Sequence, residues 1–329
     1  MISLGLLGAG RIGQTHATAL LGREDARLAA VHDPDTKAAE SVARRTGARV
    51  TGVEEILADA TVDAVLICTP TDLHAAQAEQ AAAAGKAIFC EKPIDLDLAR
   101  ARLCAERVRP AGVPFMLGFQ RRFDPHFADL RARLRAGAIG DAELVQITSR
   151  DPVPPPLAYI QRSGGLFKDM MIHDLDMARF LLGQELQVVS ATGAALTDPT
   201  IGAAGDIDTA VVTLRAAGGA LVVISNSRRA LYGYDQRVEV HGARGLLAVE
   251  NVPTTAVLAA GAEGMTRQPH QPFFMQRYAE AYRAEIDAFL ALIRGDDVAV
   301  PGLDDGLAAL ELAESCQSRA RDLRAKTGQ

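Results

Sequence analysis

A glycine-rich turn near the N-terminus constrains the fold of this chain more than any other feature. Gly8, Gly10 and Gly13 form the pattern G-x-G-x-x-G, with an apolar run at 2–7 before it and a helix-like stretch at 12–21 after it. In this context the first glycine permits a tight turn, the second lets the backbone approach a pyrophosphate, and the third allows close helix–strand packing. The chain is therefore predicted to begin with a βαβ unit that binds a dinucleotide, its phosphates facing a helix N-terminus.

The second apolar run ends in a carboxylate. Asp33 follows Gly13 by 20 residues, where an acidic side chain accepts hydrogen bonds from the adenosine ribose and repels a 2′-phosphate. A turn-forming role for the same side chain is compatible with this. No arginine follows within several positions, so the pattern favours NAD over NADP as the cofactor. We expect Arg11 and Ile12, at the start of the first helix, to complete this end of the cofactor site.

Short apolar runs alternate with amphipathic, alanine-rich stretches in the first third of the chain. The expected strands lie at 2–7, 28–32, 64–68, 87–90 and 114–117, and the expected helices at 12–21, 34–46, 73–84 and 97–108. Apolar strands that are separated by helices pair in parallel and are covered on both faces. The pattern predicts an α/β Rossmann domain with a doubly wound parallel sheet, which we assign to residues 1–120.

The pattern changes after about residue 118. Apolar runs lie at 143–148, 187–194, 208–214, 220–225, 237–241 and 246–250, and helix-like stretches at 124–135, 273–294 and 303–323. Several of the connecting turns are as short as antiparallel hairpins require. An antiparallel sheet with one apolar face needs a covering partner. We therefore expect residues 121–329 to form an α+β domain with a large, mostly antiparallel sheet that serves substrate binding and oligomerisation.

Composition excludes several classes of function. The net charge is −6 and the isoelectric point is near 5.7, so the molecule as a whole would repel nucleic-acid backbones and anionic membranes. Four cysteines without CxxC spacing favour a reducing compartment. The sequence begins without a basic leader, and no stretch approaches the ~18 apolar residues of a membrane span. We expect a cytoplasmic protein with no nucleic-acid or membrane partner.

Two further motifs follow strands of the expected parallel sheet, at the edge where ligands gather. Thr69, Pro70 and His74 belong to the sequence CTPTDLH, although a turn and a packed helix start would use the same residue types. Glu91 and Lys92 belong to the sequence EKP, in which the proline favours an extended backbone at the lysine. That geometry can direct the ammonium into a cleft beside the cofactor, the alternative being a lysine that simply reaches solvent. We expect all five residues to contribute to the cofactor site.

The segment GGLFKDMMIHDLDMARFLLG at 164–183 is the most informative part of the second half. On a continuous helix, Asp169, His173 and Asp176 fall at i, i+4 and i+7 within one stripe, and nearly every other face is apolar. Carboxylates and an imidazole on a buried helix are costly unless they are paired or face a polar cavity. The stripe therefore indicates a site, the alternative being a helix cap at Asp169 that holds His173 as a core pair. No third nitrogen or sulfur ligand is visible, so we expect no metal.

These residue types suit alcohol oxidation by a nicotinamide cofactor. One group must remove the hydroxyl proton while hydride leaves the carbon, and an imidazole is well suited to that role near neutral pH. His173 is the candidate base, and Asp169, one turn earlier, could orient it and stabilise the imidazolium. Lys92 would hydrogen-bond the reacting oxygen and stabilise its developing negative charge.

The combination of GAGRIG, Asp33, CTPTDLH, EKP and GG-x3-D-x3-H-D-x-D resembles the Gfo/Idh/MocA oxidoreductase family over the length of the chain, and SRDP and YGYD resemble its inositol dehydrogenases. The resemblance implies an N-terminal Rossmann domain, a C-terminal domain with an open sheet, a homotetramer built through those sheets, and NAD-linked oxidation of a ring polyol. It also implies that Lys92, Asp169 and His173 are catalytic, with His173 exchanging the proton. By the same resemblance, Asp151 and Tyr234 would bind substrate, together with the three catalytic residues.

Three functions remain open at this stage. The leading expectation is NAD-dependent oxidation of myo-inositol to 2-keto-myo-inositol. The second keeps the same machinery but takes another inositol isomer or a pyranose sugar, because a few side chains read the stereochemistry of one hydroxyl. The third is an NAD-binding sensor without chemistry, which would need neither Lys92 nor His173.

Overall fold

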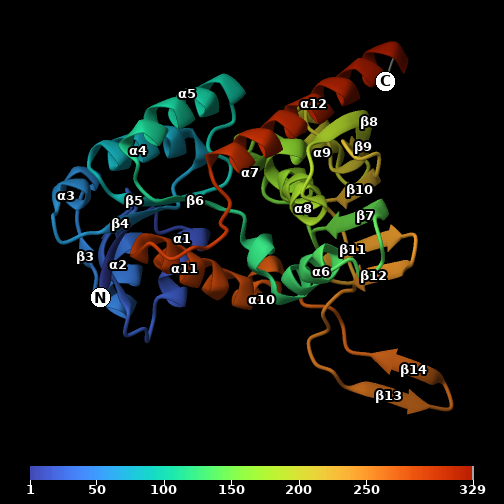
Figure 1. Cartoon of the computed structure of the whole chain (residues 1–329), viewed down its shortest axis with the longest axis horizontal. Helices are drawn as coiled ribbons and strands as arrows, with labels where there is room; N and C mark the ends of the chain where they lie inside the picture. Colours follow the sequence, from blue (N-terminus) through green and yellow to red (C-terminus); the bar gives the residue numbers. More distant parts are fainter. Residues whose placement is uncertain (328–329) are drawn as a thin grey trace. The chain divides into compact units, whose positions relative to one another are not determined.

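The computed structural model describes residues 1–327, which divide into two compact units (Figure 1). The first unit contains residues 1–123 and 280–310, and the second contains residues 124–279 and the chain from residue 311. The chain passes from the first unit to the second after residue 123, near the expected boundary between residues 120 and 121. Residues 280–310, however, belong to the first unit again. The sequence does not reveal this return, because an amphipathic helix does not specify which sheet it covers.

A six-stranded sheet forms the centre of the first unit. Its strand order is β3-β2-β1-β4-β5-β6, and all neighbouring strands are parallel. The predicted Rossmann architecture is thereby confirmed, and in this arrangement ligands bind at the carboxyl ends of the strands. The strands are β1 (Ile2–Leu7), β2 (Ala26–His32), β3 (Arg49–Val50), β4 (Ala64–Ile67), β5 (Ala87–Glu91) and β6 (Phe115–Gly118).

Helices cover the parallel sheet and bury its apolar strands. They are α1 (Arg11–Ala19), α2 (Thr36–Thr46), α3 (Val53–Ala58), α4 (Thr71–Ala83), α5 (Leu98–Val108) and α11 (Ala279–Arg294), with 3-10 turns η1 (Arg109–Ala111) and η2 (Gln120–Phe123). Leu4 and Leu66 are fully buried, as expected for strands that are covered on both faces. Helix α11 contributes Ile286 and Phe289 to the same core, which explains why this late segment belongs to the first unit. The sequence patterns did not indicate β3 or α3.

The second unit contains a six-stranded sheet of the order β12-β11-β7-β10-β9-β8. Only β7 and β10 pair in parallel, so the prediction of a mostly antiparallel sheet is confirmed. The strands are β7 (Ala142–Arg150), β8 (Leu186–Ala194), β9 (Thr209–Ala216), β10 (Leu221–Ser227), β11 (Asp235–Gly242) and β12 (Gly245–Val249). Helix α8 (Ile172–Leu182) packs against β7, whereas Val211 and Leu221 are exposed on neighbouring strands of the sheet.

The remaining elements of the second unit surround this sheet. They are α6 (Pro125–Arg135), α7 (Leu157–Ile160), the π-helical turn η3 (Phe167–Met171), α9 (Pro199–Ala203), α10 (Phe274–Arg277) and the final helix α12 (Leu303–Thr327), whose first residues belong to the first unit. A hairpin of β13 (Leu258–Gly261) and β14 (Gly264–Arg267) projects away from the six-stranded sheet with all its strand residues exposed (Figure 1). Among the described residues, no helix is long and apolar enough to cross a membrane.

Candidate active site

The three glycines of the first turn have three distinct surroundings. Gly8 has φ +93°, and a Cβ at this position would lie 2.5 Å from the carbonyl oxygen of Cys68. A Cβ on Gly13 would lie 2.0 Å from the carbonyl oxygen of Gly8, so this residue permits the close packing of α1 on the turn. A Cβ on Gly10 would meet nothing within 4 Å. The open space at Gly10, directly before Arg11 and Ile12 of α1, fits the approach of a pyrophosphate.

The carboxylate of Asp33 accepts a hydrogen bond from the same glycine-rich turn. Its Oδ2 accepts a hydrogen bond from the backbone N–H of Ala9 at 2.6 Å, and its Oδ1 accepts one from the backbone N–H of Asp35 at 2.8 Å. These bonds fix the side chain at the carboxyl end of β2. A carboxylate has about four acceptor positions, so the two remaining ones can accept ribose hydroxyls. The residues present therefore fit the predicted dinucleotide.

His74 joins the loops that follow β4 and β5. The ring is buried, with Nδ1 2.8 Å from the carbonyl oxygen of Pro93 and Nε2 2.8 Å from the carbonyl oxygen of Thr69. Thr69 also donates its hydroxyl to Gln77 at 2.6 Å, and Pro70 precedes α4. These contacts give His74 a positioning role in the loop, while a direct contact with the cofactor stays a prediction.

Glu91 is the last residue of β5 and Lys92 directly follows the strand. Glu91 is buried, and its Oε1 lies 2.7 Å from Nε2 of His16 in α1. The His16 ring also contacts the rings of Phe89 and Tyr282 edge-on. Lys92 is half-buried directly beyond this cluster. Glu91 thus anchors the segment that carries the candidate catalytic lysine.

Sequence reasoning missed Glu285, a second acid near this anchor. Its side chain in α11 is 0% exposed, and neither carboxyl oxygen has a hydrogen-bond partner among the described residues. Burial, and next the negative charge of Glu91, raise the pKa of Glu285 well above its usual range. Burial therefore favours the protonated, neutral form of this side chain. Its signal was present in the sequence, because Glu285 interrupts the apolar stripe formed by Tyr282, Ile286 and Phe289.

In the second unit, residues 166–182 of the predicted segment are helical without a break, but the helix is not regular. The π-helical turn η3 precedes α8, so Asp169 lies in the π turn and His173 in the first turn of the α-helix. The prediction that Asp169, His173 and Asp176 form one stripe at regular α-helical spacing is corrected by this observation, because a π turn changes the angle between successive residues. The Asp169 side chain is 13% exposed. Its Oδ1 accepts a hydrogen bond from the Tyr159 hydroxyl at 2.8 Å, and its Oδ2 lies 3.3 Å from both terminal nitrogens of Arg228.

A buried acid that the stripe did not single out attaches α8 to the sheet. Asp174 is fully buried and accepts hydrogen bonds from the Ser149 hydroxyl at 2.6 Å and from the Asn226 amide at 2.7 Å. Ser149 lies on β7 and Asn226 on β10, so one carboxylate fixes the helix to two adjacent strands. Asp176 of the predicted stripe is also buried, while His173 is half-buried.

The two candidate substrate-binding residues lie at one edge of the second sheet. Asp151 follows the end of β7, and its backbone N–H donates to the carbonyl oxygen of Ser227 at the end of β10 at 2.9 Å. Tyr234 precedes β11 and is mostly buried, with its ring edge-on to those of Phe273 and Tyr278. Because the end of β7 pairs with the start of β11, the fold brings these two positions to the same edge.

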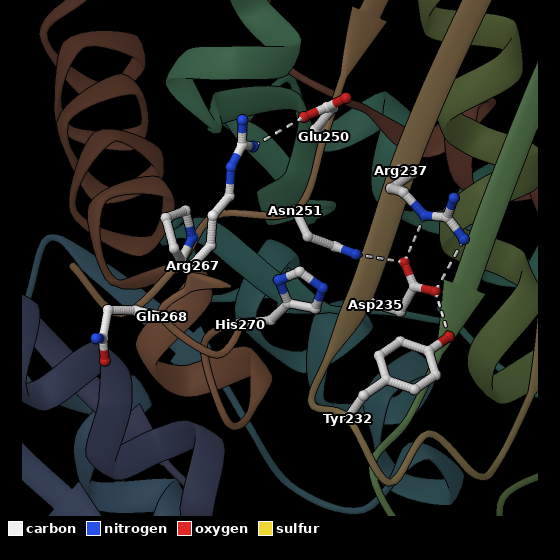
Figure 2. Close-up of a pocket in the computed structure, with 9 residues that line it drawn as sticks. Tyr232, Asp235, Arg237, Glu250, Asn251, Arg267, Gln268 and His270 are labelled. Atoms are coloured by element: carbon white, nitrogen blue, oxygen red, sulfur yellow. Dashed lines mark hydrogen bonds and ion pairs between the residues drawn. The ribbon is translucent and has the colours of Figure 1, made fainter. Parts of the chain in front are cut away.

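A polar pocket of about 270 Å³ lies beside the start of β11 (Figure 2). Its charged side chains are largely paired with one another: Asp235 bonds to Arg237, Tyr232 and Asn251. Burial opposes the ionisation of Asp235, but these bonds outweigh it and hold its pKa below the usual value. The pocket contains neither Tyr234 nor any other residue that sequence reasoning selected. Among the side chains that the structure describes, no group of His, Cys, Asp and Glu could hold a metal ion.

The first unit has the features of a dinucleotide-dependent oxidoreductase. Its parallel sheet carries an open glycine turn after β1, an acid directly after β2 and a lysine directly after β5. The family models agree: "Oxidoreductase family, NAD-binding Rossmann fold" matches residues 2–119 and "GFO/IDH/MocA C-terminal domain" matches residues 127–248. The chain therefore belongs to the GFO/IDH/MocA oxidoreductase family and is an NAD-dependent dehydrogenase.

Individual relatives narrow this class. The chain is 54% identical to the inositol 2-dehydrogenase of Rhizobium meliloti (strain 1021), with 95% of each chain covered. A crystal structure of a myo-inositol dehydrogenase from Corynebacterium glutamicum superposes with a TM-score of 0.93 at 41% identity, covering 98% of this chain and 97% of that one. The scyllo-inositol dehydrogenase of Lactobacillus casei, with bound NAD(H) and scyllo-inositol, superposes with a TM-score of 0.91 at 29% identity, covering 98% and 97%.

Proposed function

We propose that this dehydrogenase oxidises a ring polyol at one secondary hydroxyl, with myo-inositol as the leading substrate and 2-keto-myo-inositol as the product. The observation that carries the proposal is the 54% identity, over 95% of both chains, to an inositol 2-dehydrogenase. The chain keeps Lys92, Asp169 and His173 at the motif positions where proton transfer needs them. A sensor that merely binds NAD would need none of the three.

The proposed roles follow from the chemistry of the three side chains. Bound NAD supplies the hydride acceptor. The imidazole of His173 takes the hydroxyl proton, and Asp169 orients the ring and stabilises the imidazolium. The Lys92 ammonium donates a hydrogen bond to the substrate oxygen as it becomes a carbonyl. Asp151 and Tyr234 bind other hydroxyls of the ring.

A second substrate is favoured by one specific observation. The Lactobacillus casei structure, which has a TM-score of 0.91 to this chain, contains scyllo-inositol. Myo- and scyllo-inositol differ at one hydroxyl, and a few side chains at the substrate site discriminate between such isomers. Scyllo-inositol is therefore the alternative substrate, and pyranose sugars are the wider one.

The assembly and compartment belong to the same proposal. Val211 and Leu221 on the second sheet are exposed, and apolar side chains that are exposed together are typical of protein–protein contact sites. This supports a homotetramer formed through the sheets. All four cysteines are unpaired and buried, which supports a reducing, cytoplasmic location.

The substrate panel is the direct test. Purified protein is mixed with NAD and separately with myo-inositol, scyllo-inositol, other inositol isomers and aldoses, while the absorbance of reduced nicotinamide is followed. We expect the highest kcat/KM for an inositol. Tight NAD binding without turnover of any polyol would contradict the proposal and favour the sensor.

Removal of the candidate catalytic groups tests their roles. Lys92→Ala and His173→Ala should each lower turnover about 10²–10⁴-fold while NAD affinity is retained. His126→Ala is the matched control, because His126 is exposed at the start of α6. Near-normal turnover of either variant would remove that residue from the mechanism.

A further inference from the structure

The start of the helical segment that carries Asp169 is held by Asp206. Gly165 has φ +86°, and a Cβ there would lie only 2.8 Å from Oδ1 of Asp206. The same Oδ1 accepts a hydrogen bond from the backbone N–H of Leu166 at 3.1 Å. Glycine at position 165 thus lets Asp206 approach the backbone that leads into the π turn.

A buried arginine lies between Asp206 and Asp169. Arg228, directly after β10, is 0% exposed and is among the largest fully buried side chains of the described chain. Both of its terminal nitrogens lie 3.3 Å from Oδ2 of Asp169, and one lies 3.9 Å from Oδ2 of Asp206. A guanidinium remains charged in proteins, so its burial is costly unless carboxylates compensate it.

The carboxylate of Asp169 is consequently held from two sides. Arg228 contacts one oxygen, and the Tyr159 hydroxyl donates to the other at 2.8 Å. A carboxylate that orients an imidazole must itself be fixed, since small displacements of catalytic groups reduce rates strongly. Charge-assisted contacts are the stronger kind for this purpose.

We infer that Arg228 is the positioning residue of the active site, which fixes Asp169 for its work on His173, with Asp206 as the second counter-ion that keeps the guanidinium in place. This inference rests on the proposed function, because it assigns Arg228 a role through Asp169. It differs from a purely structural role in a measurable way. A purely structural arginine would change the stability of the protein without changing the kcat of the folded enzyme.

The test is a double-variant cycle on kcat with the substrate that the wild-type protein turns over. Arg228→Met should lower kcat about 10²-fold with a smaller change in KM, and Arg228→Lys, which keeps a charge, should restore part of the loss. In the Asp169→Asn background, Arg228→Met should have little further effect on kcat. Arg229→Met is the matched control, because Arg229 is the exposed neighbour in sequence.

Each result decides the question. A wild-type kcat for Arg228→Met, or the same loss of kcat in both backgrounds, would overturn the positioning role. If Arg228→Met does not fold, Arg228→Lys is the deciding variant. Its kcat is compared with the kcat values of wild type and Arg229→Met, and we expect a loss of about 3–10-fold. An unchanged kcat would then overturn the positioning role. A wild-type protein that turns over no polyol would instead contradict the proposed function, so the two failures are distinguishable.

Discussion

In the first unit Glu285 is buried with no hydrogen-bond partner among the described residues, whereas in the second unit Asp124, Asp169 and Asp174 each contact donor groups. An acid without partners avoids the cost of burial by staying protonated. An acid with cationic or hydroxyl partners can stay ionised, but only while those partners remain. The comparison teaches that the two units should respond to different perturbations: the first to pH, and the second to removal of a partner.

The largest expected effect concerns the ion pair of Asp124 and Arg277. Both side chains are buried, both terminal nitrogens of the guanidinium contact the carboxylate, and Asp124 also caps α6. Arg277→Met should lower the free energy of unfolding by about 3–5 kcal/mol, because the buried carboxylate of Asp124 loses its counter-ion. Urea unfolding measures this change, with the exposed Arg283→Met as control. A decrease in the free energy of unfolding of less than about 1 kcal/mol would contradict the expectation that the second unit is sensitive to removal of a partner.

The next effect concerns the pH dependence of the first unit. Below the usual Glu pKa of 4.5 both folded and unfolded chains carry the proton, and Glu285 contributes its full stability. As the pH rises toward the elevated pKa of the folded state, only the unfolded chain releases the proton, so stability falls by at most about 1.4 kcal/mol per pH unit.

Glu285→Gln removes this dependence, because an amide does not titrate. Its stability relative to wild type, measured by urea unfolding, should increase as the pH rises from 5 to 8, by at most about 1.4 kcal/mol per pH unit. Glu280→Gln, on the exposed side of the same region, should show no such trend. Parallel curves for wild type and Glu285→Gln would show that Glu285 is not buried in its neutral form.

The smallest effect on stability is expected at Gly10. Because a Cβ there meets nothing within 4 Å, Gly10→Ala should change the free energy of unfolding by less than about 1 kcal/mol. It should nevertheless weaken NAD binding about tenfold, since the methyl group occupies the space through which a pyrophosphate approaches. Isothermal titration calorimetry with NAD measures the affinity. Unchanged binding would place the phosphates elsewhere.

Strongly periodic segments could be predicted from the sequence, and residues defined by distant partners could not. The apolar run at 2–7 coincides with β1, and the run at 87–90 is one residue shorter than β5, because buried parallel strands leave a local signal. The short β3 has too few residues for a pattern. The hairpin of β13 and β14 carries no alternation of buried and exposed positions, since all its residues are exposed.

The candidate site shows the same limit. Gly8, Asp33 and Lys92 follow from motifs whose parts are close in sequence. The role inferred for Arg228 depends on its contact with Asp169, which is 59 residues away in the sequence, so no local pattern could reveal the pair. The π turn likewise gives no signal in the spacing of the residues, and it changed the stripe predicted for Asp169 and His173.

The imidazole of His74 has one more consequence. Two adjacent parallel strands are held to each other by ladder hydrogen bonds, but those bonds stop where the strands stop. Beyond that point a single ring joins the carbonyl groups of Thr69 and Pro93. The ring thus links the two loops at the end of the parallel sheet where ligands bind, and we expect a displacement of one loop to be transmitted to the other.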